Sequence, residues 1–463
     1  MASIQFPFDL HSIKSADEFR AKAGQAGYEI PVSDDLAALR KPFSVNGRKI
    51  ENSMAIQPLE GLDACPEGMP SELTLARYEK LAAQGAGILW VEATSVCPEG
   101  RDSQRQLWLH EGSAAGFARL VREIDTAAIK AGHKPPSKVI QLTHSGRCSR
   151  DADGKPAPMS AFANPFLDPV MGKPQIVTDE YLDHLQVQVG EAAALAWEAG
   201  FDAVELKLCH QYLFKELLCA YTRPGRYGGN QQNRFRFAHG AIDQIRSRVG
   251  TRQDIVVRLN AYDGIPWPYG WGMKPGEIEE TGKPEEIAGP MQIDLTEVIE
   301  LMRQLYRRDI RIFNLTTTSP RFAPAGNGYM DNFREDAQVD PLAGVAALLK
   351  ATRQIRQTMY RDVHIVGTGL SWLGPLSAGG GAGGIEEGWF DIAGFGRSVM
   401  ADLEFIPSIL RGDYPDPSKA CLGCDNCFKL FFKGLPTGCA VRRQAYREVL
   451  RMCPQLNNDL IVY

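Results

Sequence analysis

The sequence predicts a (β/α)8 barrel, or TIM barrel, followed by a small cysteine-rich segment. Eight short apolar runs typical of strands are separated by segments that include six helical patterns, and four cysteines crowd together near the end. Strands that alternate with helices pair in parallel through right-handed crossovers. Eight such units over about 360 residues favour a closed barrel over an open sheet.

The expected strands are short and apolar. They are Ser53–Gln57, Gly87–Ala93, Val139–Thr143, Ala203–Leu208, Ile255–Asn260, Ile310–Leu315, Val363–Val366 and Phe390–Gly394. The expected helices carry apolar residues at i, i+3 and i+4. They are Leu73–Gln84, Gly116–Ala131, Asp179–Ala199, Arg234–Val249, Leu295–Arg308 and Leu342–Tyr360. Thr178 is the expected N-cap of the third helix, and Gly200 ends it.

These patterns divide the chain into three parts. We expect a leader at 1–48, the barrel at 49–412 and the cysteine segment at 413–463. Two long loops, 261–292 and 319–340, follow strands and therefore belong to the C-terminal face of the barrel, where such enzymes keep their chemistry. Their expected wall residues are Trp267, Trp271, Arg321 and Tyr329. The glycine-rich stretch 377–388 matches neither a P-loop nor a dinucleotide fingerprint.

Composition narrows the class of protein. The 463 residues are 44% hydrophobic and 23% charged, with a net charge of -5, and no basic stripe indicates a nucleic-acid partner. The first residues lack the pattern of a secretory signal, and no run of about 18 apolar residues predicts a membrane span. We therefore expect a cytoplasmic protein that binds no membrane. A homo-oligomer is expected as well, although no motif in the sequence indicates the oligomeric state.

The cysteine cluster is the strongest local motif. Cys421, Cys424 and Cys427 stand at two-residue gaps, and Cys439 follows. Three thiolates in one knuckle and a fourth from a later loop favour a [4Fe–4S] cluster. A structural zinc site and unrelated thiols are the alternatives, although zinc ribbons usually present two C-x2-C knuckles.

Polar residues at strand ends predict a catalytic face. Lys207, His210 and Tyr212 lie at the end of the fourth expected strand. Gln141 and Arg258 lie within apolar strands, where a buried amide or guanidinium requires a partner, either a ligand or a neighbouring strand. The last two strands end in glycine turns at Gly367–Gly369 and Gly394–Gly396, followed by Arg397, a pattern that suits a phosphate.

Taken together, these motifs resemble the old yellow enzyme family (NADH:flavin oxidoreductases). They are most similar to its iron–sulfur branch, which includes 2,4-dienoyl-CoA reductase and trimethylamine dehydrogenase. The resemblance covers about residues 45–440. The matching stretches are Met54–Gln57, Val91–Thr94, Pro98–Arg101, Gln141–Arg147, His210–Tyr212, Tyr227–Gly229, Gly394–Arg397 and the cysteine cluster.

The resemblance implies FMN and assigns residues to it. Ala55, Ile56, Gln57 and Ala93 match positions that line the isoalloxazine ring, and Gln141 matches the residue that hydrogen-bonds its pyrimidine edge. Arg258 matches the cation beside flavin N1 and the C2 carbonyl. Gly369, Gly396 and Arg397 match the phosphate site, His210 a substrate anchor and Tyr212 the proton donor.

Two departures from the family stand out. The first anchoring position, often His or Asn, is Lys207, which can act as an anchor or, if burial lowers its pKa, as a base. The sequence ends at Tyr463, 24 residues past Cys439, without the nucleotide-binding domains of the iron–sulfur relatives. Electrons are therefore expected from a separate protein, a second subunit, or NAD(P)H directly.

The expected reaction is reduction of an activated C=C bond in a small-molecule substrate, with electrons relayed through the cluster. Oxidation of an amine or a C–H bond is the alternative within enzymes. An electron-transfer or scaffold subunit is the alternative of another class, and it predicts a barrel mouth closed to small molecules.

Overall fold

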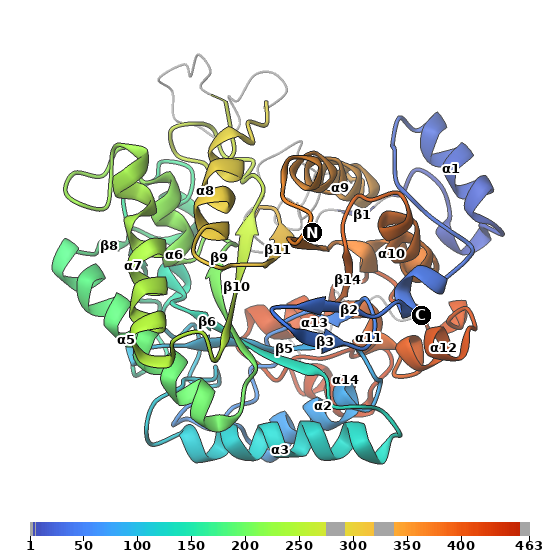
Figure 1. The fold of residues 1–463 in the computed structure, drawn as a ribbon, viewed down its shortest axis with the longest axis horizontal. Helices are drawn as coiled ribbons and strands as arrows, with labels where there is room; N and C mark the ends of the chain where they lie inside the picture. The colour runs from blue at the N-terminus through green and yellow to red at the C-terminus, as the bar shows by residue number, and fades with distance from the viewer. Residues whose placement is uncertain (1–2, 5, 275–291, 319–337, 454–463) are drawn as a thin grey trace.

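The computed structural model of the chain describes residues 3–4, 6–274, 292–318 and 338–453 (Figure 1). Eight parallel strands close into a barrel, and the last pairs with the first through Ala393 and Met54. In barrel order the strands are β4 (Met54–Ile56), β5 (Ile88–Ser95), β6 (Ser137–Thr143), β9 (Ala203–Leu208), β10 (Asp254–Asn260), β11 (Ile312–Thr316), β13 (His364–Gly367) and β14 (Ile392–Phe395). The predicted fold is confirmed, and each predicted strand ends within two residues of the observed one.

Helices surround the barrel, with α5 and α7 on one side and α9 and α10 on the other (Figure 1). The larger ones are α1 (Ala16–Gln25), α2 (Glu72–Ala82), α3 (Ala114–Lys130), α5 (Asp179–Ala199), α7 (Gln231–Val249), α8 (Thr296–Tyr306), α9 (Pro341–Thr358) and α10 (Ser377–Glu386). The Thr178 hydroxyl caps α5 by accepting from the Tyr181 N–H, and Gly200 ends the helix in the left-handed region at φ 96°.

The N-terminal end of the barrel is closed by part of the leader. An antiparallel hairpin, β2 (Phe43–Val45) and β3 (Arg48–Ile50), precedes the first barrel strand. Val45 and Ile50 pack against apolar residues of the barrel strands, Val139 and Val256 among them. The site therefore lies at the opposite, C-terminal end.

The glycine-rich stretch forms a helix that the sequence did not predict. Residues Ser377–Glu386 make up α10, which connects the last two strands after a 3-10 turn at Leu370–Leu376. A Cβ atom at Gly384 would overlap the ring of Phe390, and one at Gly383 would meet the Val32 backbone. Helix propensity disfavours glycine, but here its small size allows close packing.

The predicted wall residues fall in two groups. Arg321 and Tyr329 belong to 319–337, which lies outside the described residues, as does 275–291 of the loop 261–292. Trp271 is fully buried, and its indole N–H donates to the Asn260 carbonyl at 2.9 Å, so it is a core residue rather than a cavity wall. Within the described ranges, no helix is long and apolar enough to cross a membrane.

The packing of α10 predicts a stability difference between two glycine substitutions. Gly384→Ala should lower the free energy of unfolding by about 1–3 kcal/mol, because the added methyl group overlaps Phe390. Gly24→Ala in α1 is the control, since a Cβ atom there has nothing within 4 Å. It should be neutral or stabilising by up to about 1 kcal/mol. Urea unfolding measures both, and equal effects would contradict the packing argument.

Candidate active site

A cavity opens at the C-terminal mouth of the barrel. It encloses about 1130 Å³ including its open side. Its lining comes from several strand ends and from the cysteine segment: Gln57, Pro58, Leu59, Glu60, Lys207, His210, Tyr212, Arg258, Thr316, Thr317, Thr368, Gly369, Ser371, Trp372, Gly394, Gly396, Arg397, Met400, Cys427, Phe428, Phe431 and Thr437. A concave, mostly apolar pocket with a few convergent polar groups is typical of a cofactor site.

The segment after β9 brings two of the predicted residues into this cavity. His210 and Gln211 both adopt the left-handed region, at φ 63° and 60°, which side chains other than glycine rarely do. The tight turn carries the chain from Leu208 to Tyr212, and Tyr212 is only 3% exposed. Backbone strain of this kind persists only where the surroundings enforce it.

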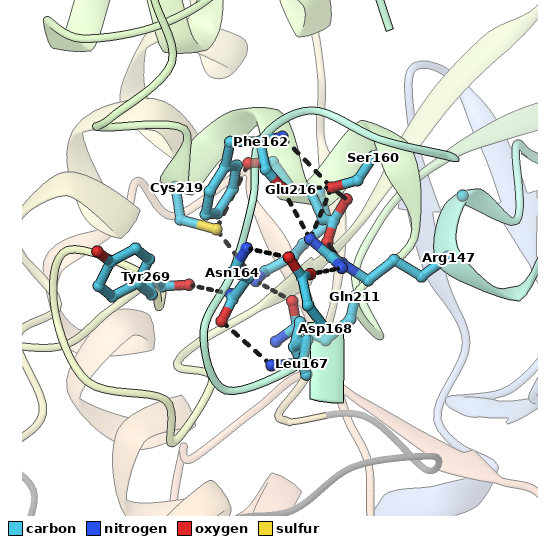
Figure 2. A network of polar contacts seen from close by, with 12 residues as sticks. Arg147, Ser160, Phe162, Asn164, Leu167, Asp168, Gln211, Glu216, Cys219 and Tyr269 are labelled. Carbon is cyan, nitrogen blue, oxygen red and sulfur yellow. Dashed lines mark hydrogen bonds and ion pairs between the residues drawn. The ribbon is translucent and has the colours of Figure 1, made fainter. Parts of the chain in front are cut away.

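A buried polar network provides that enforcement (Figure 2). The Arg147 guanidinium pairs with the carboxylates of Glu216 and Asp168, and it donates to the Ser160 hydroxyl at 2.8 Å. Glu216 lies in the short helix α6 (Leu213–Glu216), directly after Tyr212. Because buried ion pairs are costly to disrupt, the network holds this segment in one position.

Three side chains meet at one wall of the cavity. The Glu60 carboxylate accepts from the Lys207 ammonium at 2.9 Å and from the Tyr212 hydroxyl at 3.2 Å, both at Oε1. The Lys207 nitrogen also lies 3.8 Å from the centre of the Tyr212 ring. The side chains of Lys207 and Glu60 are 3% and 9% exposed, so this is a nearly dry ion pair.

His210 and Arg258 also belong to the polar part of the lining. Burial and the positive charges of Arg258 and Lys207 hold the pKa of His210 well below its usual value, so its imidazole is neutral near pH 7. Its Nε2 lies 3.3 Å from the Thr316 hydroxyl. The Arg258 Nε is buried without a hydrogen-bond partner among the described residues, and the guanidinium borders the cavity.

A polar layer lies inside the barrel beneath the cavity. Glu205 accepts from the Gln141 amide at 2.5 Å and from the Asn314 amide at 3.2 Å. Asn314 in turn exchanges hydrogen bonds with Gln57. Burial raises the pKa of Glu205, while the nearby charge of Arg258 opposes that rise.

Another part of the cavity lining has the features of an anion site. Gly369, at φ 83°, is the N-cap of a 3-10 helix, and Gly396 precedes the short helix α11 (Arg397–Ala401). A Cβ atom at Gly394 would overlap the Gln57 amide, so the backbone passes closer here than a side chain allows. The Arg397 guanidinium lies over the Trp372 ring and donates to Asp425 at 2.6 Å.

The four clustered cysteines line a second, smaller cavity. Cys421, Cys424, Cys427 and Cys439 all border it, together with Arg397. Cys427 lines both cavities, so the cysteine segment forms part of the wall of the first. In the part of the chain that the structure describes, no three His, Cys, Asp or Glu side chains lie close enough to ligate a single metal ion.

The structure brings most of the predicted site residues together. Gln57, Lys207, His210, Tyr212, Arg258, Gly369, Gly396 and Arg397 all line the first cavity. Ala55, Ile56, Ala93 and Gln141 are buried in their strands and do not border it. Sequence reasoning missed Glu60, Thr316, Trp372 and Phe428; the one available signal was that Glu60 follows a strand end by four residues.

Comparison with known proteins gives the family. The sequence model of the NADH:flavin oxidoreductase / NADH oxidase family matches residues 38–290. The chain is 28% identical over 239 residues to an NADPH dehydrogenase of Clostridium acetobutylicum, covering 51% of this chain and 67% of that protein. It is 23% identical to a metal reductase of Desulforamulus reducens, covering 89% of this chain and 54% of that protein.

Solved structures show the same fold. A 2-naphthoyl-CoA reductase in complex with 2-naphthoyl-CoA is similar with a TM-score of 0.69 and 20% identity, over 89% of this chain and 58% of that one. The chain thus spans little more than half the length of some relatives. The family match, the barrel and the strand-end site lead to one conclusion: this chain belongs to the NADH:flavin oxidoreductase / NADH oxidase family, as a flavoenzyme of the old yellow enzyme type.

Proposed function

We propose that this protein reduces a C=C bond conjugated to a carbonyl group, with FMN as its cofactor and NAD(P)H as the direct or indirect electron source. One observation carries the proposal: Lys207, His210 and Tyr212, the anchoring and proton-donating positions of the family, line one open cavity with Arg258. An open mouth also favours an enzyme over a scaffold or electron-transfer subunit.

The residues of the cavity fit FMN. The unpartnered Nε of Arg258 suits the electron-rich N1 and C2-carbonyl edge of the isoalloxazine, where negative charge gathers on reduction. Helix N-termini after Gly369 and Gly396 suit the phosphate, with Arg397 beside them. Gln57 borders the same space and would contact the ring, while Ala55, Ile56, Ala93 and Gln141 are buried in the barrel strands. FMN, when bound, supplies hydride to the substrate.

Side chains of the protein stabilise the negative charge that develops on the substrate and transfer a proton to it. The carbonyl oxygen of the substrate gains negative charge as its alkene is reduced. Lys207 and His210 donate hydrogen bonds to that oxygen, an electrostatic role that is strong where water is excluded. Since the pKa of His210 is lowered, it donates as a neutral imidazole. Tyr212 then transfers its hydroxyl proton to the α-carbon.

We further propose that Cys421, Cys424, Cys427 and Cys439 hold a [4Fe–4S] cluster that relays single electrons to this cavity. All four thiols border one small cavity. Structural zinc sites usually present two C-x2-C pairs. Three cysteines at two-residue gaps with a lone fourth from a later loop suit a four-iron cluster better, because it takes one thiolate at each iron. NAD(P)H, a second subunit or a separate protein would provide the electrons.

Removal of the Arg258 charge tests the flavin site. Arg258→Met should weaken FMN binding by at least about 30-fold, the low end of the cost of losing one partner of a buried charged contact. Quenching of flavin fluorescence by the flavin-free protein measures the dissociation constant. Arg252→Met, at an exposed arginine before the same strand, is the control. An unchanged affinity in Arg258→Met would refute this role.

Removal of the Tyr212 hydroxyl tests the reaction. In anaerobic assays with 2-cyclohexen-1-one, Tyr212→Phe should reduce the alkene about 10²–10⁴ times more slowly, because the proton donor is lost. Reduction of the flavin by NAD(P)H should be unaffected. Tyr360→Phe, at an exposed tyrosine, is the control. Full turnover by Tyr212→Phe would contradict the role of Tyr212. If amines reduce the flavin and enones do not reoxidise it, the result would count against ene reduction.

Metal content tests the cysteine site. Protein purified without oxygen should contain about four irons and four sulfides per chain and absorb broadly near 400 nm, as expected for a four-iron cluster. Cys421→Ala should lose most of the iron, whereas Cys453→Ala, at a cysteine outside the small cavity, should keep it. One zinc per chain without iron or sulfide would contradict the assignment.

A further inference from the structure

Glu60 is a charged residue of the cavity wall that the sequence did not predict. It lies in the loop after β4, lines the main cavity and contacts both Lys207 and Tyr212 through one oxygen, at 2.9 and 3.2 Å. Its carboxylate therefore touches the substrate anchor and the proton donor at once. Sequence resemblance assigned roles to both of those residues and none to Glu60.

The loop that carries Glu60 is fixed from two sides. The Gly61 N–H donates to the buried carboxylate of Glu92. The Gly61 carbonyl accepts from the Thr437 N–H at 2.7 Å, which ties the loop to the cysteine segment. A side chain at Gly61 would also overlap the Arg77 guanidinium, so the backbone packs closely against this buried arginine. Glu60 is therefore held at its contact distance by its neighbours.

The position of Glu60 determines which substrate group can reach Lys207. An ammonium has three N–H donors, so Lys207 can keep Glu60 on one and offer another to a neutral carbonyl oxygen. A substrate carboxylate at the same point would face the Glu60 carboxylate across a dry site. Like charges opposed in a dry site are strongly unfavourable.

We propose that Glu60 is a positioning and specificity-determining residue that selects neutral α,β-unsaturated ketones, aldehydes or thioesters over α,β-unsaturated carboxylates. It offsets the charge of Lys207, which would otherwise attract an acid, and it orients the ammonium and the Tyr212 hydroxyl toward the cavity. The inference rests on the ene reduction proposed above and adds the substrate class.

Glu60→Gln removes the negative charge of this side chain and keeps its shape, so it tests the role of the charge in substrate selection. With FMN bound, kcat/KM should be compared for 2-cyclohexen-1-one and for cyclohex-1-ene-1-carboxylate. The ratio should shift toward the carboxylate by at least about 10-fold, mainly through a lower KM, because one opposing charge is removed. Glu60→Asp, which retains the charge, should preserve the preference for the ketone. Glu111→Gln, at an exposed carboxylate, is the control. An unchanged ratio in Glu60→Gln would overturn the proposal.

A binding measurement on the unaltered holoenzyme keeps the proposal testable if the variant does not fold or lacks flavin. Benzaldehyde and benzoate should each perturb the flavin absorbance when they bind over it. Benzaldehyde should bind at least about 10-fold more tightly. Equal or tighter binding of benzoate would overturn the role of Glu60. If benzaldehyde binds as expected and no alkene is reduced, the ene reduction fails while the selectivity for neutral carbonyls stands.

Discussion

Two buried cations side by side are the constraint on which this site depends. Lys207 and Arg258 are direct neighbours across the β9–β10 pair, and both border the cavity. Like charges at such positions destabilise a sheet. Burial makes the repulsion larger, because water no longer screens it. The fold must therefore place negative charge close to each of them.

The two cations are compensated in different ways. Lys207 has a carboxylate in contact, since Glu60 lies 2.9 Å away. Arg258 has the charge of Glu205 nearby, inside the barrel, but its Nε remains without a hydrogen-bond partner among the described residues. The protein thus pairs Lys207 with a carboxylate, whereas Arg258, whose guanidinium borders the cavity, keeps one N–H donor without a partner among the described residues. An electron-rich flavin edge supplies the missing acceptor, which links the charge balance of the barrel to its cofactor.

The cysteine segment contacts the residues that line the cavity. Asp425, between two of the cysteines, accepts from Arg397 at 2.6 Å, and Thr437 supports the loop that carries Glu60. Cys427 and Phe428 lie in the cavity wall itself. A cluster in this segment would thus be separated from the flavin cavity by no more than a side chain. A substitution in the segment should therefore also affect the cavity.

The sequence predicted most of what local patterns can encode. The barrel strands are short apolar runs with clear ends, so β9 and α5 were located to the residue. A polar side chain in or directly after a buried strand requires a hydrogen-bond partner or a ligand. This requirement allowed the sequence to predict four site residues: Lys207, His210, Tyr212 and Arg258. Glu60 was missed because an acidic residue in a loop is usually solvated, and only the folded barrel brings it to Lys207. The helix α10 was missed because its five glycines disfavour a helix locally, and only tertiary packing makes them suitable.

The hairpin that closes the N-terminal end was missed for the same reason. Its two strands have three residues each, too short for alternation to be visible. Their apolar residues gain burial only against the finished barrel. The role of Gln141 at the cofactor stays a prediction, and the sequence did not show that its amide donates to Glu205 on a neighbouring strand. Contacts between distant segments decided each of these cases.

The flavin content of the purified, unaltered protein tests the central claim most directly, because the open donor of Arg258 requires an acceptor. The protein can be denatured by heat and the released cofactor identified by chromatography, before and after incubation with excess FMN. The account predicts a yellow protein that releases about one FMN per chain, as expected for a tightly held cofactor. Colourless protein that takes up no FMN would contradict this account, since the buried Arg258 guanidinium would then have no flavin acceptor for its hydrogen bond.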